Sequence, residues 1–203
     1  MIVKKIRQKR IGVLIIFDDF ESQVLNKDVF NKSGLFVGAD LSENELNKLL
    51  RLSAEIDVRT KAYRLLARRS HSVSELRMKL LKKQFDEEIV SATLNSLLEN
   101  HYLDDKKFAF LFADETIRNK KYSVNKVKAE LLKRGISKSI INEIIEKYQD
   151  DEIILNNIKN LSEKKILFLQ HKYSNEQVIK QKTFEYLFRK GFEAEKIRMI
   201  LNN

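Results

Sequence analysis

The sequence contains one six-residue pattern three times: Leu80-Leu81-Lys82-Lys83-Gln84-Phe85, Leu131-Leu132-Lys133-Arg134-Gly135-Ile136 and Leu187-Phe188-Arg189-Lys190-Gly191-Phe192. Each copy has two apolar residues, two basic residues, a glycine or glutamine, and one apolar residue. This order is typical of a helix end, because basic side chains face the negative end of the helix dipole and glycine leaves the helix through the left-handed region. We expect each copy to bury its apolar pair, expose its basic pair and end a helix.

The first copy differs from the others at one position. Gln84 stands where the later copies have Gly135 and Gly191. A residue with a Cβ atom is strained by about 1–2 kcal/mol in the left-handed conformation. The first helix is therefore expected to end less sharply than the other two.

The residues around the pattern also repeat, at offsets of about 51 and then 56 residues. A serine precedes each middle helix: capping boxes are predicted at Ser72 with Glu75 and at Ser174 with Gln177, and Ser123 matches Ser72. A leading helix precedes each serine, so each repeat has three helices whose apolar stripes pack together. The predicted fold is mainly α, with three tandem three-helix repeats in an elongated curved array. The predicted repeats span residues 57–103, 104–150 and 151–203.

A small β-rich segment with a linking helix is predicted before the repeats, over residues 1–56. Residues 11–17 are β-branched and aromatic, residues 1–6 precede them, and residues 20–25 fit a return strand. Residues 26–33 fit a helical turn or loop. The spacing of Ser42 and Glu45 then predicts a capping box, after which the chain is expected to be helical to its end.

Charge is distributed in step with the repeats. Lys and Arg number 39 against 29 Asp and Glu, a formal net charge of +10 over 203 residues. Each predicted repeat carries +3, whereas residues 1–56 carry +1. A polyanion or an acidic protein surface is a natural partner for such a chain. The alternative is a generic lysine-rich composition without functional meaning.

Several functions are disfavoured by composition. The chain has no cysteine, and its three histidines are far apart in sequence, so no metal or other cofactor is predicted. The five glycines form no phosphate-binding loop, and no nucleophile grouping is evident, so an enzyme is not expected. No apolar run is long enough to span a membrane and no signal peptide is recognisable, which predicts a cytoplasmic protein without a membrane partner.

Basic residues at the helix ends and in the linkers are the candidates for contact with a partner or with DNA. They are Arg68, Arg69, Lys82, Lys83, Arg118, Lys120, Lys121, Lys133 and Arg134. Tyr122, beside two lysines, is a possible base-stacking residue. The competing interpretation is that the basic pairs merely cap helix C-termini on a solvated face. The linker cations favour a partner more, because crowded like charges repel.

Three stretches carry a resemblance to a known family: residues 62–80, beginning Ala62-Tyr63-Arg64-Leu65-Leu66, residues 102–109, and residues 130–136. Together with the repeat pattern over residues 57–203, they resemble the RecX family, the modulators of the RecA recombinase. The strand-rich N-terminal segment is similar to the extension of some members. The resemblance implies the same three-helix repeats.

The resemblance further implies a non-enzymatic protein of recombination, DNA repair and the SOS response. Such a protein binds along the groove of the RecA–DNA filament and alters filament growth, ATP hydrolysis and strand exchange. We expect a monomer that also contacts single- or double-stranded DNA through its basic surface. Two alternatives remain open: an autonomous basic helical-repeat DNA-binding protein, and a helical scaffold for another protein.

Overall fold

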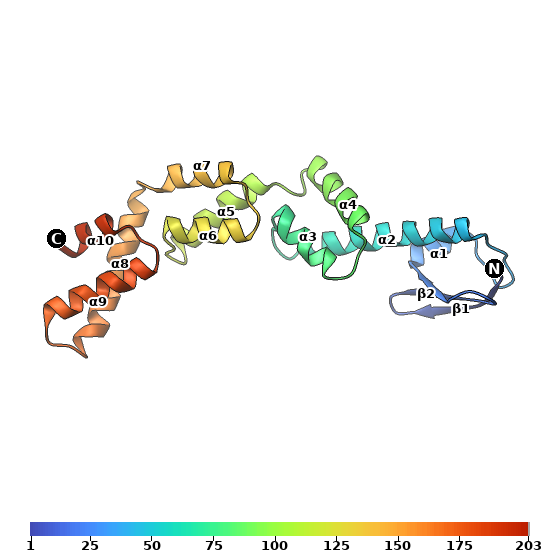
Figure 1. The fold of residues 1–203 in the computed structure, drawn as a ribbon, viewed down its shortest axis with the longest axis horizontal. Coiled ribbons are helices and arrows are strands. Elements are labelled where there is room, and N and C mark those ends of the chain that lie inside the picture. Colours follow the sequence, from blue (N-terminus) through green and yellow to red (C-terminus); the bar gives the residue numbers. More distant parts are fainter. Residues whose placement is uncertain (203) are drawn as a thin grey trace. The chain divides into compact units, whose positions relative to one another are not determined.

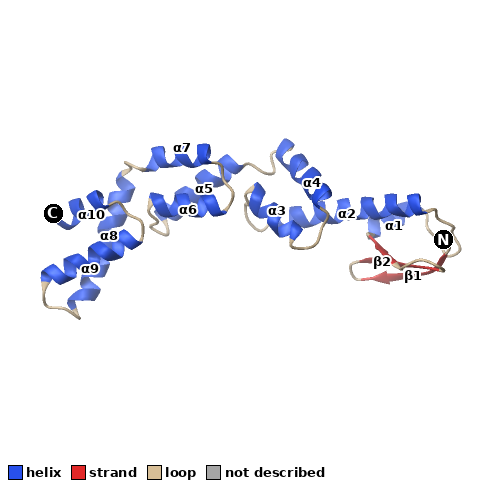
Figure 2. Cartoon of the chain, in the orientation of Figure 1, coloured by secondary structure: helices blue, strands red, loops and turns tan. Residues whose placement is uncertain are grey.

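The computed structural model describes residues 1–202, which form two compact units. Unit 1 consists of residues 1–71 and 76–103, coloured blue to green in Figure 1. Unit 2 consists of residues 72–75 and the chain from Asp104 onward, mostly yellow to red. Over the described residues the chain is mainly helical, with one small sheet, as predicted (Figure 2).

The sheet of unit 1 has three antiparallel strands in the order β1 (Val3–Lys9), β2 (Gly12–Phe17) and β3 (Gln23–Leu25). Alternate residues of β2 point into the core, as expected for a sheet with one covered face. The return strand was predicted from residue 20 but starts at Gln23. Asp18 explains the delay, since its carboxylate accepts the N–H groups of Ile2 and Asp19 and holds a bend there.

Four helices follow in unit 1: α1 (Lys27–Ser33), α2 (Glu43–Leu66), α3 (Val73–Leu81) and α4 (Glu87–Glu99). The predicted capping box of α2 is present, because Ser42 and Glu45 bond reciprocally. Asp86 caps α4, its carboxylate accepting the N–H groups of Glu88 and Ile89. The first residues of α3, up to Glu75, group with unit 2. The capping box at Ser42 could be predicted because it depends only on neighbours in sequence.

Unit 2 contains two further sets of three helices. They are α5 (Asp105–Arg118), α6 (Val124–Lys133), α7 (Lys138–Tyr148), α8 (Glu152–Gln170), α9 (Glu176–Arg189) and α10 (Ala194–Asn202). One core runs through both sets and includes Tyr148, which is fully buried. With the end of α2, α3 and α4, these helices give the predicted succession of three-helix sets. The residue limits assigned to the repeats from sequence stay a prediction.

The start of α9 differs from the prediction. Asn175, not Ser174, is the N-cap, and its side chain accepts the N–H groups of Gln177 and Val178. Asparagine is at least as good an N-cap as serine. This middle helix is longer than that of the preceding set, since α9 has 14 residues and α6 has 10.

Candidate partner-binding surface

The repeated six-residue pattern ends α3, α6 and α9, but it does not bury its apolar pair. Leu80, Leu131 and Leu187, the first members, are fully buried. The second members of the later copies, Leu132 and Phe188, are 45% and 56% exposed. Consecutive helical residues point about 100° apart, so one core cannot receive both. The prediction of a buried pair is wrong for α6 and α9, which each end with an exposed apolar side chain beside the cations, while Leu81 at the end of α3 is half-buried.

All three copies leave the helix through the left-handed region, with φ of 61° at Gln84, 72° at Gly135 and 85° at Gly191. In α6 the Ile136 N–H donates to the Leu131 carbonyl (3.1 Å), and α9 has the same closing bond at 3.3 Å. The backbone hydrogen bonds described for α3 include no equivalent. α3 ends at Leu81, one position earlier in the pattern than α6 and α9, which end at Lys133 and Arg189. The less sharp ending expected for the first copy stays a prediction.

A serine hydroxyl links successive middle helices. Ser72 accepts the Glu75 N–H at the start of α3 and donates to the Arg134 carbonyl at the end of α6 (2.6 Å). Ser123 starts α6 in the same way and donates to the Lys190 carbonyl at the end of α9 (2.7 Å). Both serines are buried. We call each arrangement a serine junction.

The glycines of the pattern allow the serine junctions to close. A Cβ atom on Gly135 would lie 2.4 Å from the Ser74 Cβ, and one on Gly191 would lie 2.8 Å from the Ser123 Oγ. Both distances are shorter than van der Waals contact allows. Glycine is therefore required here for close approach as well as for positive φ.

Arg134, a predicted contact residue, is largely engaged at the first serine junction. Its guanidinium donates to the Glu130 carboxylate (2.7 Å), lies 3.5 Å from that of Glu75, and stacks 4.4 Å from the Phe112 ring centroid. The hydrogen bond from Arg134 lowers the pKa of Glu130. The side chain is 25% exposed, so little of it faces solvent.

The other basic residues of the first two copies are more available. Lys82 and Lys83 are exposed, and the described part of the chain gives neither an ion-pair partner. Lys133 is 72% exposed and has a long 3.4 Å ion pair with Glu130. These three lysines retain most of their capacity to contact an anionic partner.

The linker cations divide into two groups. Arg68 and Arg69 are exposed after α2, and Arg69 donates to the Ser70 carbonyl. Arg118 pairs with Asp114 (2.7 Å), whose pKa this bond lowers, and Lys120 lies 3.7 Å from Glu115. Arg118 and Lys120 were predicted to need an external partner because like charges crowd in this linker. Carboxylates of α5 neutralise part of that charge within the chain.

Lys121 and Tyr122 complete this linker. Lys121 adopts a left-handed conformation with φ of 53°. Tyr122 is half-buried against the core of unit 2, and the Lys126 ammonium lies 4.0 Å from its ring centroid. The Tyr122 ring is therefore already in contact with the core and with a cation, which leaves less of it to stack on a base.

A continuous strip of lysines and aromatic rings on α8 and α9 was not predicted. The Lys165 ammonium lies 5.0 Å from the Phe168 ring centroid and 5.2 Å from that of Tyr186, which joins the two helices. Lys172 extends the strip over Phe168 (4.7 Å), and Lys190 extends it over Tyr186 (5.1 Å). We call these five residues the α8–α9 strip. Phe168 is 51% exposed, so the strip offers both charge and apolar area.

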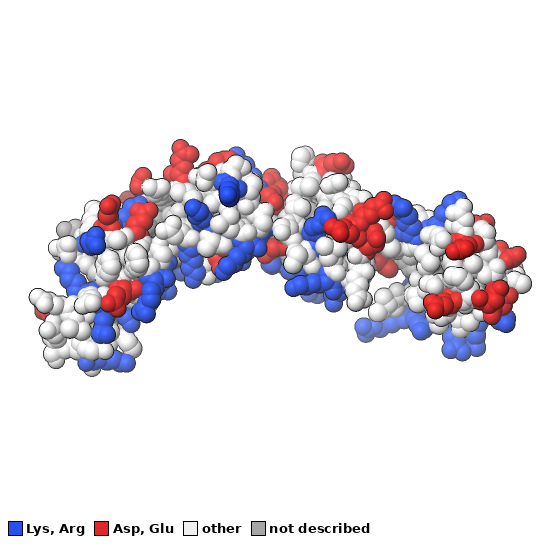
Figure 3. All heavy atoms as spheres, viewed as in Figure 1, with Lys and Arg blue, Asp and Glu red and all other residues white. Residues whose placement is uncertain are grey.

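The sequence did contain a signal for this strip. Lysines and aromatic residues alternate through residues 164–190, a composition typical of surfaces that bind polyanions by charge and stacking. Figure 3 shows Lys and Arg gathered along the lower edge of unit 2, where α6, α8 and α9 lie in Figure 1. The α8–α9 strip therefore belongs to a surface of unit 2 that is cationic and partly aromatic.

Two features are absent from residues 1–202. No helix in this range is long and apolar enough to cross a membrane. No cluster of three or more His, Asp or Glu side chains within it is arranged to hold a metal ion.

The fold and surface together define a class: proteins built of tandem three-helix repeats with a basic surface. Two family models match this chain, "RecX, first three-helix domain" over residues 59–97 and "RecX, second three-helix domain" over residues 104–145. A regulatory protein RecX of Chlorobium phaeobacteroides is 32% identical over 141 residues, covering 70% of this chain and 89% of the relative. The chain belongs to the RecX family.

Other relatives match over more of the chain. The regulatory protein RecX of Caldanaerobacter subterraneus is 28% identical, covering 100% of this chain and 98% of its own. A crystal structure of a regulatory protein RecX aligns with a TM-score of 0.71 at 20% identity, over 100% of this chain and 99% of that one. RecX from Lactobacillus salivarius aligns with 0.66 at 21% identity, over 73% and 95%. At these identities the solved structures establish a shared fold.

Proposed function

We propose that this chain regulates a RecA recombinase by binding the RecA–DNA filament and altering its growth, ATP hydrolysis and strand exchange. The observation that carries the proposal is membership of the RecX family. Relatives in several bacteria are regulatory proteins RecX, and this chain matches them along most of their length. Recombination, DNA repair and the SOS response are the processes that such regulation would serve.

The surface of the described residues supports a filament as the partner. A RecA–DNA filament presents phosphates and repeated protein surfaces, and this chain offers exposed lysines at the ends of α3 and α6 and the α8–α9 strip. Repeated weak contacts to a repeating partner add avidity without a single tight site. Contact along the filament groove through the helix ends is part of the proposal.

The proposal assigns no reaction to this chain. A regulator of this kind needs binding surfaces, and the titratable groups with displaced pKa values belong to structural contacts. Asp105 illustrates this, because burial raises its pKa while its carboxylate accepts the Val73 N–H (2.9 Å). We propose a monomer that acts in the cytoplasm, where the filament forms.

An ATPase titration tests the proposal. Purified protein added below RecA stoichiometry should change the rate of ATP hydrolysis on single-stranded DNA. A Lys165→Glu/Lys190→Glu variant should shift the titration to higher protein concentration, since it reverses two charges of the α8–α9 strip. Lys159→Glu/Lys180→Glu is the matched control, because both lysines are exposed on the same helices outside the strip. No effect of the folded wild type at any ratio would exclude this function.

A second candidate, an autonomous DNA-binding protein, is favoured by one observation. The α8–α9 strip combines cations with an exposed ring, as single-strand binding surfaces do. This function predicts binding to naked DNA with a steep salt dependence and the same behaviour without RecA. Measuring DNA affinity with and without RecA separates the two candidates.

A further inference from the structure

The N-terminal unit has a cationic surface that its net charge conceals. Residues 1–56 sum to +1, yet five of the seven residues at positions 4–10 are Lys or Arg. These residues form β1, an edge strand, and the turn after it. Blue atoms accordingly line the lower edge of unit 1 in Figure 3, where the β1–β2 hairpin lies.

The register of the sheet places three of these cations on its outer face. Ile6 pairs with Ile15, which is fully buried, so this row of side chains faces the core. Lys5 and Arg7 pair with residues of β2 in the alternate row and therefore point outward, as does Lys9. Same-face residues of a strand recur about every 6.8 Å, so the three cations form a line.

A hollow of about 700 Å³ continues this line at the hairpin turn. It is bounded by the turn, the start of α1 and the second half of α2. Four cations and two carboxylates are among its lining residues: Arg10, Lys27, Lys61, Arg64, Asp28 and Asp57. Asp57 accepts a hydrogen bond from the Asn26 side chain (2.6 Å). We call Lys5, Arg7, Lys9 and the four cations of the hollow the N-terminal basic surface.

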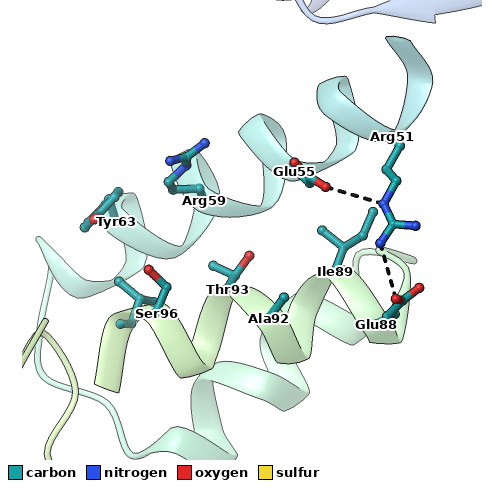
Figure 4. A pocket seen from close by; sticks show the side chains of 10 residues that line it. Arg51, Glu55, Arg59, Tyr63, Glu88, Ile89, Ala92, Thr93 and Ser96 are labelled. Atoms are coloured by element: carbon teal, nitrogen blue, oxygen red, sulfur yellow. Dashed lines mark hydrogen bonds and ion pairs between the residues drawn. The ribbon is translucent and has the colours of Figure 1, made fainter. Parts of the chain in front are cut away.

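Within the described part of the chain, the seven cations have no carboxylate partner. Over residues 1–202, no ion pair or side-chain hydrogen bond engages any of them. The other side of α2 contrasts with this, because Arg51 there lies 3.5 Å from Glu55 and 3.2 Å from Glu88 (Figure 4). That neighbouring hollow, about 240 Å³ in volume, is thus partly neutralised. The charge of the N-terminal basic surface remains available to an external anion.

We propose that the N-terminal basic surface binds the sugar-phosphate backbone of a nucleic acid without reading its sequence. The residues that form it are cations, and the one strongly exposed apolar side chain at the hollow is Ile11, at 80%. Ile11 provides no stacking platform for bases. The aromatic ring that lines the hollow, Phe85, is half-buried, whereas Phe168 of the α8–α9 strip is 51% exposed. Charge complementarity along a line therefore favours a polyanionic strand.

The inference goes beyond the proposed function, since it assigns a nucleic-acid contact to a segment outside the helical repeats. Neutralised phosphates release counterions, so the number of contacts appears as the slope of log K against log salt concentration, about −0.9 per contact for duplex DNA and −0.7 for single strands. This slope counts the contacts directly. Its measurement requires no RecA.

The experiment compares two triple variants of the full chain. Arg10→Gln/Lys61→Gln/Arg64→Gln removes three charges from the hollow. Lys48→Gln/Arg51→Gln/Arg59→Gln removes three charges from one stripe on the opposite side of α2. Binding to a fluorescent duplex and to a single strand of mixed sequence is measured by anisotropy from 50 to 300 mM salt, and urea unfolding confirms that each variant is folded.

The hollow variant should reduce the magnitude of the slope by about 2–3 on its preferred strand type, while the control changes it by less than about 1. A Lys5→Gln/Arg7→Gln/Lys9→Gln variant, altered only on the exposed sheet face, should give a similar reduction if the hollow variant is poorly folded. An unchanged slope in the folded hollow variant would overturn the proposal. Equal effects of the hollow and control variants would also overturn the proposal, because DNA binding would then depend on the net charge of the chain and not on this surface.

These outcomes are separable from those of the ATPase titration. The proposed RecA regulation can fail while the hollow still sets the salt slope on naked DNA. Conversely, RecA ATPase can respond to the wild type while the hollow variant binds DNA normally. The two assays therefore test the two proposals independently.

Discussion

The end of α3 and the ends of α6 and α9 have the same backbone conformation but different residues. Gln84 at the end of α3 has φ of 61° and is exposed, whereas Gly135 and Gly191 have φ of 72° and 85° and lie against serine junctions. Positive φ is therefore accessible to a glutamine at this position. What excludes a side chain at the later ends is the neighbouring helix start.

The difference teaches that glycine in this pattern marks a junction more than a helix end. A terminal glycine is usually explained by the left-handed conformation alone. Here the same conformation occurs with and without glycine, and close approach of Ser74 or Ser123 separates the cases. Four substitutions follow in order of decreasing expected effect: three test this interpretation, and one, at Tyr148, tests the core of unit 2.

Gly135→Ala should have the largest effect. The new Cβ combines left-handed strain of about 1–2 kcal/mol with overpacking of about 1–3 kcal/mol against Ser74, so the free energy of unfolding should fall by about 3 kcal/mol. Urea denaturation measures this loss. Adding Ser74→Gly should restore the part of the unfolding free energy that is lost to overpacking. A double variant as unstable as Gly135→Ala would show that the close approach of Ser74 to Gly135 is unimportant.

Ser123→Ala tests the hydroxyl of the second junction. It removes an N-cap and leaves the Lys190 carbonyl without its donor, so a loss of about 2 kcal/mol in unfolding free energy is expected. Ser137→Ala is the matched control, because Ser137 caps α7 while exposed, and should lose about 1 kcal/mol. Equal losses would mean that the bond to Lys190 contributes nothing.

Tyr148→Phe tests the stability of unit 2 against pH. Burial and a hydrogen bond to Asp114 (3.0 Å) raise the pKa of Tyr148 to about 12. Because this folded-state pKa exceeds the ordinary value near 10, the phenol stabilises the fold below pH 10 and its contribution is lost as pH rises toward 12.

The variant should lose about 1 kcal/mol at pH 7 through the missing hydrogen bond. Its deficit should shrink between pH 10 and pH 12, where the wild type loses the stabilisation of the neutral phenol. Chemical denaturation of both proteins at pH 7, 10 and 11 measures the difference. A deficit that stays constant over this range would contradict the assigned pKa.

Gln84→Gly should have the smallest effect and the opposite sign. Relief of left-handed strain exceeds the extra conformational entropy of glycine in the unfolded chain by roughly 0.5–1 kcal/mol, so unfolding free energy should rise. Thermal unfolding monitored by circular dichroism is sensitive enough for this change. A decrease on substitution would indicate that the Gln84 side chain makes a stabilising contribution.

Features set by neighbours in sequence could be predicted. The capping box at Ser42, the caps at Asp86 and Asp104, and the left-handed Gln84 follow from short-range hydrogen bonds and sterics. The exchange of Ser174 for Asn175 is a local error, because two good capping residues stand side by side there.

Features set by distant contacts could not be predicted. Arg134 was grouped with exposed cations, since its contact with Glu75 joins residues far apart in sequence. The α8–α9 strip depends on Lys165 reaching a ring on another helix. Averaging charge over residues 1–56 likewise hid the cations of β1. These features required the fold to be known.

The serine junctions have a thermodynamic consequence for the whole of unit 2. Each hydroxyl satisfies the start of one helix and the end of another, so fraying of either helix removes a partner from both. Neighbouring helices are thereby coupled in their opening equilibria, as in nearest-neighbour descriptions of repeat proteins. Amide hydrogen exchange near Ser123 should therefore follow exchange at the distant Gly191 end of α9, so that the two ends open as a single cooperative element.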